Sequence, residues 1–315
     1  MSRLRRRTFL AGSAMAPLVG CAAPEPFDPI ESQRAYPPLG AFVTVDGLQV
    51  HYWTAGEGKP VVLVHGASGN LRDWTFSIAP ELARSNKVIV FDRPGFGYSE
   101  RPAERGWDPA VQAAVLKKAT DALSVERPIL VGHSWGGALV LAWALDHPEA
   151  VAGVVPVSAV AMPYGGLARV VSFLGLDGFV VDAYSRYMLS TAREGGVERF
   201  LARVFRPQNV PEGYADYVGA PLALRGSTLR ANGEDLQYIS GNLGEMAPRY
   251  GGLDLPVEVI HGQSDFVSWD HHAGPLAERL PRSNLTLLPG VGHMAHHAAP
   301  GEIANAIARI ETVGV

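Results

Sequence analysis

The stretch that most constrains this chain is Gly132-His133-Ser134-Trp135-Gly136, which matches the pattern G-x-S-x-G. The apolar run that ends at Val131 predicts a buried strand, and residues 138–145 predict a helix. A serine in a tight turn between a strand and a helix is typical of a nucleophile elbow. The flanking glycines lack Cβ, so the backbone can crowd around Ser134 and hold it in a strained conformation with Oγ exposed. The stretch therefore predicts that Ser134 is a nucleophile, the alternative being a serine in an ordinary turn.

Strand and helix patterns alternate on both sides of this stretch. Strands are predicted at 42–45, 48–53, 61–64, 88–91, 129–131, 151–157, 257–260 and 285–288, and helices at 71–83, 111–123, 138–145, 271–280 and 303–310. The first two strands flank Asp46-Gly47, a strong hairpin signal. The chain has 315 residues, of which 47% are hydrophobic, enough for one large domain with an insertion. We therefore predict an α/β fold with a mostly parallel central sheet flanked by helices.

Residues 161–250 interrupt this rhythm with helical patterns and no apolar strand run. Because insertions leave a sheet where its strands end, we expect a helical cap over the carboxyl ends of the strands. The core would then comprise residues 41–160 and 251–315. Large apolar side chains of the cap either form its own core, the commoner arrangement, or line an acyl pocket; they are Phe173, Phe179, Tyr184, Tyr187, Met188, Phe200 and Phe205.

The N-terminus has the features of an export signal. Arg6-Arg7-Thr8-Phe9-Leu10 resembles a twin-arginine signal, and Leu18-Val19-Gly20-Cys21 resembles a bacterial lipobox. We predict a signal peptide over residues 1–20, lipidation at Cys21 and a proline-rich tether over 21–40. The protein would be exported across the cytoplasmic membrane and lipid-anchored, on the periplasmic side or at the cell surface. The alternatives are a basic tail and a buried free cysteine.

Four separated motifs then carry a family resemblance. They are His65-Gly66, the stretch around Ser134, His261-Gly262-Gln263-Ser264-Asp265 and Gly290-Val291-Gly292-His293. In this chain order they resemble the α/β-hydrolase superfamily with a helical cap, from about Phe42 to Ile310. The resemblance implies the α/β-hydrolase fold and leaves the substrate open, because this fold supports many chemistries.

A serine hydroxyl needs a base within hydrogen-bonding reach, and imidazole is best suited to that role near neutral pH. The resemblance assigns the base to His293, after the last predicted strand. The competing histidines are His271, His272, His296 and His297. No acid or cysteine cluster with ligand spacing accompanies them, so we predict no metal site.

The third member of the triad is an acid that orients the imidazole. Asp265 occupies the His-Gly-x-x-Asp position of the family, with Asp254 and Asp270 as alternatives. Two backbone N–H groups would stabilise the oxyanion. The resemblance assigns them to Trp135 and to Ala67, although Ser68 is an alternative to Ala67.

The loop 92–99 is predicted to be structural, with Arg93 paired to a nearby acid. The net charge of −4 offers no electrostatic case for nucleic-acid binding, so the expected partners are a small-molecule substrate and, through the anchor, a membrane.

The predicted activity is that of a serine hydrolase without a cofactor, most often a carboxylic ester hydrolase in this superfamily. A carbon–carbon bond hydrolase or a cofactor-free haloperoxidase would use the same triad. A protein that keeps the fold only to bind a ligand is the alternative from another class.

Overall fold

The computed structural model describes residues 27–165, 177–192 and 195–313. Eight strands form one sheet in the order β1-β2-β4-β3-β5-β6-β7-β8. The strands are β1 (Ala41–Val45), β2 (Leu48–Ala55), β3 (Pro60–Val64), β4 (Lys87–Phe91), β5 (Ile129–His133), β6 (Gly153–Val157), β7 (Val257–Gly262) and β8 (Ser283–Leu288). The pairs β1–β2 and β2–β4 are antiparallel and all other pairs are parallel. The predicted mostly parallel sheet with an antiparallel hairpin at its edge is confirmed.

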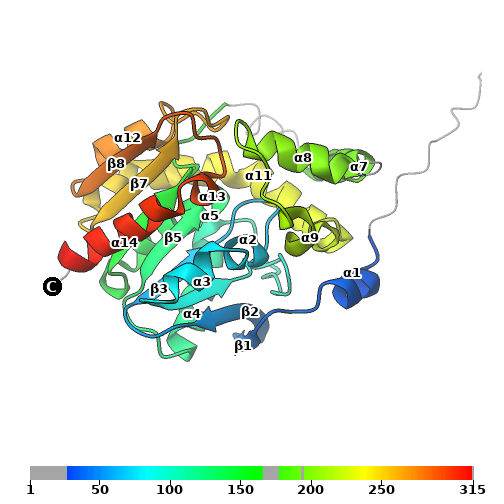
Figure 1. Cartoon of the computed structure of the whole chain (residues 1–315), viewed down its shortest axis with the longest axis horizontal. Coiled ribbons are helices and arrows are strands. Elements are labelled where there is room, and N and C mark those ends of the chain that lie inside the picture. Colours follow the sequence, from blue (N-terminus) through cyan, green and yellow to red (C-terminus); the bar gives the residue numbers. More distant parts are fainter. Residues whose placement is uncertain (1–26, 166–176, 193–194, 314–315) are drawn as a thin grey trace, which may run out of the picture.

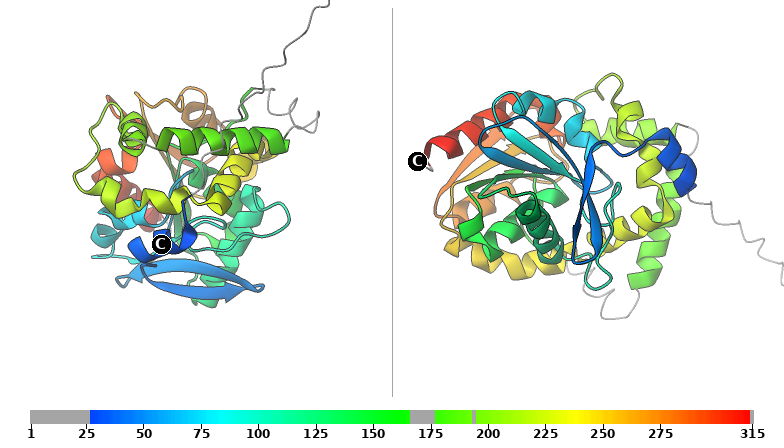
Figure 2. Two further views of the ribbon diagram at one scale, coloured as in Figure 1. Left: turned by 90° about the vertical axis from the view of Figure 1, so that its right-hand side faces the viewer. Right: turned by 90° about the horizontal axis from the view of Figure 1, so that it is seen from below.

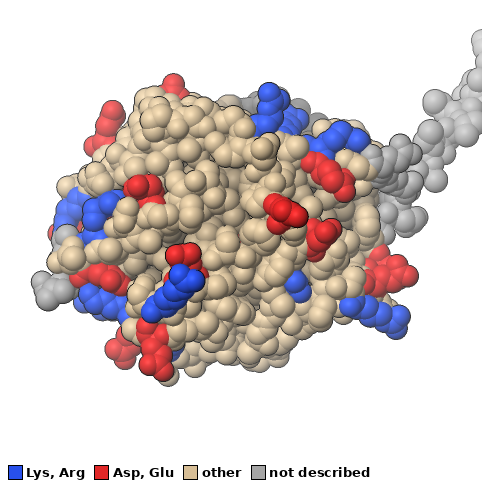
Figure 3. Space-filling model, in the orientation of Figure 1, with Lys and Arg blue, Asp and Glu red and all other residues tan. Residues whose placement is uncertain are grey.

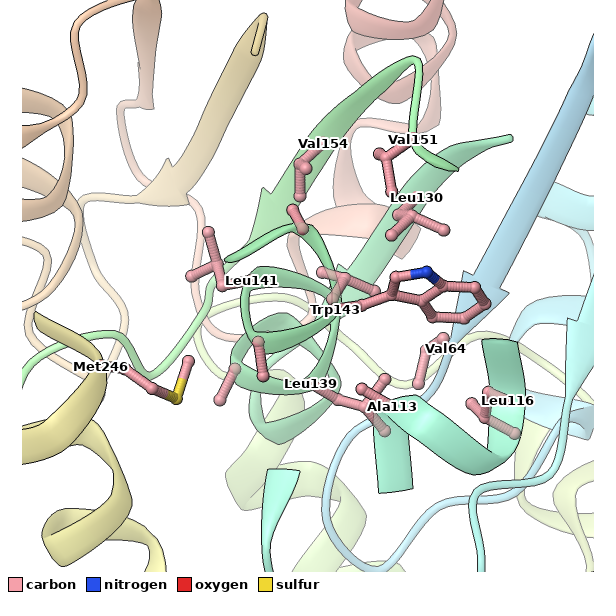
Figure 4. Close-up of a cluster of buried hydrophobic side chains, with 14 of the residues drawn as sticks. Val64, Ala113, Leu116, Leu130, Leu139, Leu141, Trp143, Val151, Val154 and Met246 are labelled. Atoms are coloured by element: carbon pink, nitrogen blue, oxygen red, sulfur yellow. The ribbon is translucent and has the colours of Figure 1, made fainter. Parts of the chain in front are cut away.

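Helices cover both faces of this sheet (Figure 1). The helices α4 (Pro109–Ala122), α5 (Trp135–Asp146) and α12 (Ala273–Arg279) contribute to one buried cluster, and α3 (Ile78–Leu82) and α14 (Pro300–Val313) to the other. Successive residues of β3 alternate between them, Val62 and Val64 facing the first and Val61 and Leu63 the second. Figure 4 shows part of the first cluster, where Trp143 of α5 packs among aliphatic side chains. Burial of the strands on both faces explains their continuous apolar runs.

The predicted single helix over 71–83 is wrong. The structure has two short helices there, α2 (Arg72–Thr75) and α3, which are separated at Ser77 (φ −149°, ψ −45°). Pro80 has no N–H to donate to the carbonyl of Phe76, so a continuous helix would lose a hydrogen bond and gain a steric clash at that point. The predicted apolar face of this segment is confirmed, because Trp74, Ile78 and Leu82 are all buried.

Between β6 and β7, the described residues form helices and no strand. The helices are α7 (Asp177–Ala192), α8 (Gly196–Phe205), α9 (Tyr214–Val218), α10 (Ala220–Ala223) and α11 (Gly226–Met246), followed by the short η2 (Ala247–Gly252). They gather on one side of the molecule in both orientations of Figure 2. We refer to the segment from α7 to α11 as the cap.

The N-terminal segment differs from a simple tether where it can be described. Pro29–Ala35 form α1, whose N-cap Asp28 accepts hydrogen bonds from Ile30 N and Glu31 N. Ser32 Oγ donates to the carbonyl of Pro221, so α1 rests against the cap. The proline-rich composition concealed this helix because Pro29 stands at its first position, where proline is tolerated. In the described part of the chain, no helix is long and apolar enough to cross a membrane.

Candidate active site

The elbow has the strained geometry that its glycines predict. Ser134 lies between β5 and α5 with φ 53° and ψ −116°. A Cβ on Gly132 would come within 2.2 Å of the Gly136 carbonyl oxygen, and one on Gly136 within 2.5 Å of the His65 oxygen. Because real Cβ atoms do not approach backbone so closely, these positions require glycine, and α5 begins directly beside the end of β3.

Three of the predicted site residues come together at this elbow. His293 Nε2 lies 3.0 Å from Ser134 Oγ. His293 Nδ1 lies 2.9 Å from each carboxylate oxygen of Asp265. Asp265 follows β7 and His293 follows β8, so the carboxyl ends of parallel strands bring the three side chains to one edge of the sheet. The arrangement has the geometry of a nucleophile, a base and an acid that orients the base.

Asp265 remains an anion in this environment. Burial alone would raise the pKa of its carboxyl group, but hydrogen bonds and charge from His261 and His293 hold that pKa well below its usual range. The Val267 N–H also donates to Oδ1 over 2.8 Å. Since an ionised carboxylate only accepts hydrogen bonds, His293 Nδ1 must carry the proton and its Nε2 presents a lone pair to Ser134.

The competing residues have other partners. His296 and His297 contact Asp73 over 3.1 and 2.8 Å. His272 Nδ1 accepts from the Ala161 and Met162 amides, and burial lowers its pKa to about 4, so its imidazole is neutral. His271 Nε2 lies 3.1 Å from the Pro163 carbonyl oxygen. Among the acids, Asp270 binds Ser268 and Asp254 lies 3.7 Å from Arg282.

The loop after β3 lies against the elbow. A Cβ on Gly66 would stand 3.1 Å from Ser134 Cβ, and Ala67 lines the same cleft as the serine. The Ser68 N–H donates to Asn232 Oδ1 over 2.9 Å. Among the described residues, the Ala67 and Trp135 amides have no protein acceptor. Of the two alternatives in this loop, Ala67 therefore has the available donor and Ser68 does not.

An open cleft of about 540 Å³ reaches Ser134 and His293. A second, apolar cavity of about 90 Å³ lies beside it under α8 and α11. Both are bordered by Ser68, Gly69, Asp73, Phe200, Leu201 and Tyr214, so the two spaces adjoin. The second cavity is lined further by aliphatic side chains, among them Met188, Ala223, Leu224 and Leu229.

The cap side chains singled out in the sequence differ in their surroundings. Phe200 and Met188 line cavities, and Phe205 is buried against Tyr214 and Met294 in the base of the cap. Tyr184 hydrogen-bonds Asn232. Phe179 and Tyr187 are exposed, and Phe173 lies outside the described residues.

Sequence reasoning missed a buried polar cluster behind His293. One Asp73 oxygen accepts from His297 and Tyr214 and the other from His296, and His133 Nε2 lies 3.0 Å from the His293 carbonyl oxygen. Asp73, His133 and His296 stand close enough, within 4.8 Å, to share a metal ion. The prediction that no acid or cysteine cluster with ligand spacing accompanies these histidines overlooked Asp73, which lies 223 residues before His296 and which only tertiary folding brings close to it. Their hydrogen bonds account for the cluster as a support for the segment that carries His293.

Arg93 pairs with an acid, but the acid belongs to the cap. Its guanidinium lies 2.8 Å from Asp235 of α11, and both side chains are fully buried. The same guanidinium stacks on the rings of Phe96 and Trp135, with its carbon 4.1 Å from each centroid. The buried ion pair therefore joins α11 of the cap to Arg93, and the Arg93 guanidinium in turn stacks on Trp135, the residue that follows Ser134.

Known proteins share this fold. The model of the alpha/beta hydrolase fold family matches residues 59–300. The chain is 32% identical over 225 residues to 2-hydroxymuconate semialdehyde hydrolase of Pseudomonas sp. strain CF600, a match that covers 64% of this chain and 79% of that one. It is 28% identical over 267 residues to 2-hydroxy-6-oxo-6-phenylhexa-2,4-dienoate hydrolase of Burkholderia cepacia, covering 81% and 90%. The solved structure of Est816, described as an N-acyl homoserine lactone degrading enzyme, superposes with a TM-score of 0.62 at 26% identity over 85% of this chain and 99% of that one.

Proposed function

The chain belongs to the α/β-hydrolase fold family and is a hydrolase, and from this premise we propose that it cleaves carboxylic esters through an acyl-enzyme on Ser134. The observation that carries the proposal is the continuous line of hydrogen bonds from Ser134 through His293 to Asp265. An intact line of this kind favours catalysis over ligand binding alone.

Each group in this line has a step to perform. Ser134 Oγ attacks the ester carbonyl while its proton passes to His293 Nε2. The Ala67 and Trp135 amides hold the oxyanion, which collapses as His293 returns the proton to the departing alcohol. Water then attacks the acyl-enzyme and gives a proton to His293, and the second collapse releases the acid and restores the serine hydroxyl. Asp265 stabilises the imidazolium in both halves.

The lining of the cleft favours an uncharged substrate. Among the described residues around the cleft and the adjoining cavity, none is Lys or Arg. His272, which does line the cleft, is held neutral by burial and by its two backbone donors. The apolar cavity that adjoins the cleft suits the hydrocarbon chain of an acyl group that extends from Ser134 into it. On these grounds we propose a neutral ester with an apolar acyl chain.

Hydrolysis of a carbon–carbon bond is the second candidate, because relatives named above are hydrolases of dienoates and of a muconate semialdehyde. A dienoate carries a carboxylate, and such an anion calls for a cation in its pocket. None of the described residues that line the cleft is Lys or Arg, so the ester remains the first candidate.

The first experiment is labelling of the purified protein with a fluorophosphonate, followed by assays on p-nitrophenyl esters and on a 2-hydroxy-6-oxodienoate. We expect labelling and ester turnover, and Ser134→Ala should lose both, with kcat at least about 10⁴-fold lower. Preferential turnover of the dienoate would replace the ester proposal with the second candidate. Absence of labelling and of turnover in folded wild-type protein would refute the serine mechanism.

We also propose that the protein is exported and anchored through a lipid on Cys21. The paired arginines Arg6 and Arg7, the short apolar segment and the position of the cysteine support this proposal. All of these residues lie outside the described part of the chain.

The charges on the surface are compatible with an enzyme that acts on a small molecule. On the face that Figure 3 shows, acidic and basic side chains are interspersed and form no large basic patch.

A further inference from the structure

Helix α11 of the cap contacts both segments that carry the proposed oxyanion donors. Asn232 and Asp235 are three residues apart on this helix and therefore lie on one face of it. Asn232 reaches the loop of Ala67, and Asp235 reaches the side chain of Trp135, whose N–H is the other donor. Both cap residues are almost completely buried, at 2% and 0% exposure.

The contact of Asn232 with Ser68 holds the peptide group that follows Ala67, which joins Ala67 to Ser68. Asn232 Oδ1 accepts from the Ser68 N–H over 2.9 Å, and its Nδ2 donates to Ser68 Oγ over 2.8 Å and to the Tyr184 hydroxyl. The amide thus uses its oxygen and its nitrogen on separate partners, which fixes its orientation. Ser68 has φ 58°, an uncommon conformation for a residue other than glycine. Two hydrogen bonds from Asn232 hold the loop in this conformation.

Arg93 and His65 hold the peptide group that precedes Ala67, which joins Gly66 to Ala67. Arg93 is fixed by Asp235 over 2.8 Å, and its Nη2 lies 3.4 Å from the Gly66 carbonyl oxygen. His65 Nε2 accepts from the Arg93 N–H over 3.0 Å, so its Nδ1 carries the proton and donates to the same carbonyl over 2.8 Å. Burial and the charge of Arg93 lower the pKa of His65 to about 4, in keeping with a neutral ring.

The planarity of the peptide bond converts these contacts into an orientation for the donor. In a trans peptide, the carbonyl of one residue and the N–H of the next point in opposite directions. Since the Gly66 carbonyl faces His65 and Arg93, the Ala67 N–H must face away from them. With Ser68 N–H held by Asn232, neither peptide group beside Ala67 is free to rotate.

Trp135 is held by the same helix. Its indole Nε1–H donates to the Asp235 carbonyl over 3.3 Å, and its ring stacks on the Arg93 guanidinium. The segments of both proposed donors therefore contact α11 of the cap, in addition to the support that His65 and Arg93 of the core give to the Gly66–Ala67 peptide group.

We propose that Asn232 is a positioning residue for the oxyanion hole, so that the cap contributes to the chemical step as well as covering the cleft. This inference rests on the proposed function, because an oxyanion forms only if Ser134 attacks a carbonyl. Without the Asn232 oxygen, the Ser68 amide loses its acceptor and the Ala67–Ser68 peptide group can rotate, while His65 and Arg93 still hold the Gly66–Ala67 peptide group. Ala67 is then fixed on one side only, which weakens binding of the transition state more than binding of the neutral substrate.

The test compares Asn232→Ala with Asn242→Ala, a matched change of a buried asparagine on the same helix. Steady-state kinetics on a p-nitrophenyl ester should show kcat about 10- to 100-fold lower for Asn232→Ala, with KM within about twofold of wild type. The rate of fluorophosphonate labelling should fall in parallel, because the phosphonyl oxygen occupies the same hole. Asn242→Ala should retain wild-type kcat.

The variant Asn232→Asp tests whether a lower kcat in Asn232→Ala reflects only a loss of folded protein. Its carboxylate can still accept from the Ser68 N–H, so kcat should lie above that of Asn232→Ala at a similar Tm. An unchanged kcat in folded Asn232→Ala, an effect confined to KM, or an equal loss of kcat in Asn242→Ala would overturn the inference while leaving the proposed function intact. A wild-type protein that neither labels nor hydrolyses esters would overturn both.

Discussion

His261 Nε2 lies 3.1 Å from Asp265 Oδ2, so the carboxylate that orients His293 is itself held by a second imidazole. The same nitrogen lies 2.7 Å from the Val267 carbonyl oxygen, an acceptor, which shows that His261 Nε2 carries a proton. Both side chains are buried, at about 1% and 0% exposure. The single Nε2 proton is shared between the Val267 carbonyl, the closer acceptor, and the Asp265 carboxylate, so His261 helps to fix the position of that carboxylate.

This relationship predicts that replacing His261 lowers the activity, although His261 does not contact the Ser134 nucleophile itself. His261→Phe keeps a ring of similar size but removes the donor, and a hydrogen bond to a charged group contributes about 1.5–3 kcal/mol. We expect kcat to fall about 10- to 100-fold, less than in Asp265→Asn, where the acid itself is lost. His261→Gln retains an N–H donor and should recover most of the activity. Equal kcat in the wild type and His261→Phe would exclude a positioning role.

The apolar cavity that adjoins the cleft of Ser134 predicts a dependence on acyl length. Burial of each methylene is worth about 0.8 kcal/mol, so kcat/KM should rise roughly fourfold per methylene until the cavity is full. Ala223→Phe places a ring in this cavity and should lower kcat/KM for the p-nitrophenyl octanoate at least about tenfold, with the acetate within about twofold. Ala202→Phe, on the exposed side of α8, is the matched control and should leave both values unchanged. A profile that Ala223→Phe does not shift would assign the acyl chain to another space.

Buried neutral histidines predict acid sensitivity of the fold. Burial lowers the pKa values of His65, His272 and His296 from 6.5 to about 4. Between these values the unfolded chain binds more protons than the folded chain, so the free energy of unfolding decreases as the pH falls from about 6.5 to about 4. We expect Tm to be nearly constant above about pH 7 and to decrease by several degrees across this window.

The variant His272→Gln separates this contribution from others. Its side-chain oxygen can accept from the Ala161 and Met162 amides but does not titrate. Its Tm should therefore depend less steeply on pH than that of the wild type between about pH 6.5 and 4. An identical slope in the two proteins would show that His272 does not contribute to the acid sensitivity.

The lipobox predicts membrane attachment through one residue. Cys21→Ser removes the only thiol of the chain and should move the protein from the membrane fraction to the soluble fraction after cell lysis. Replacement of Arg6 and Arg7 by lysine should instead prevent export, detected as protein that retains its first twenty residues. Unchanged attachment of Cys21→Ser would refute the lipid anchor without bearing on the triad.

The sequence alone determined the features that depend on local patterns. Continuous apolar runs identified the strands because a sheet covered on both faces buries every side chain, as in β3 and β5. The glycines around Ser134 identified the elbow because no other residue fits so close to neighbouring backbone. The order of Ser134, Asp265 and His293 followed from motifs at strand ends. The break at Ser77 was missed because apolar periodicity continues across it.

Tertiary structure decided the contacts between segments far apart in the chain. The acid that pairs with Arg93 is Asp235, and the group that occupies the Ser68 amide is Asn232, each more than a hundred residues away. No local pattern identifies such partners. In the sequence, a polar residue on one face of a helix is indistinguishable from a side chain exposed to solvent, and only the tertiary structure shows that another element covers it. Burial made these residues pair, because a polar group removed from water must find a partner within the protein. The cap is joined to the catalytic core through these buried pairs, and only the folded chain shows it.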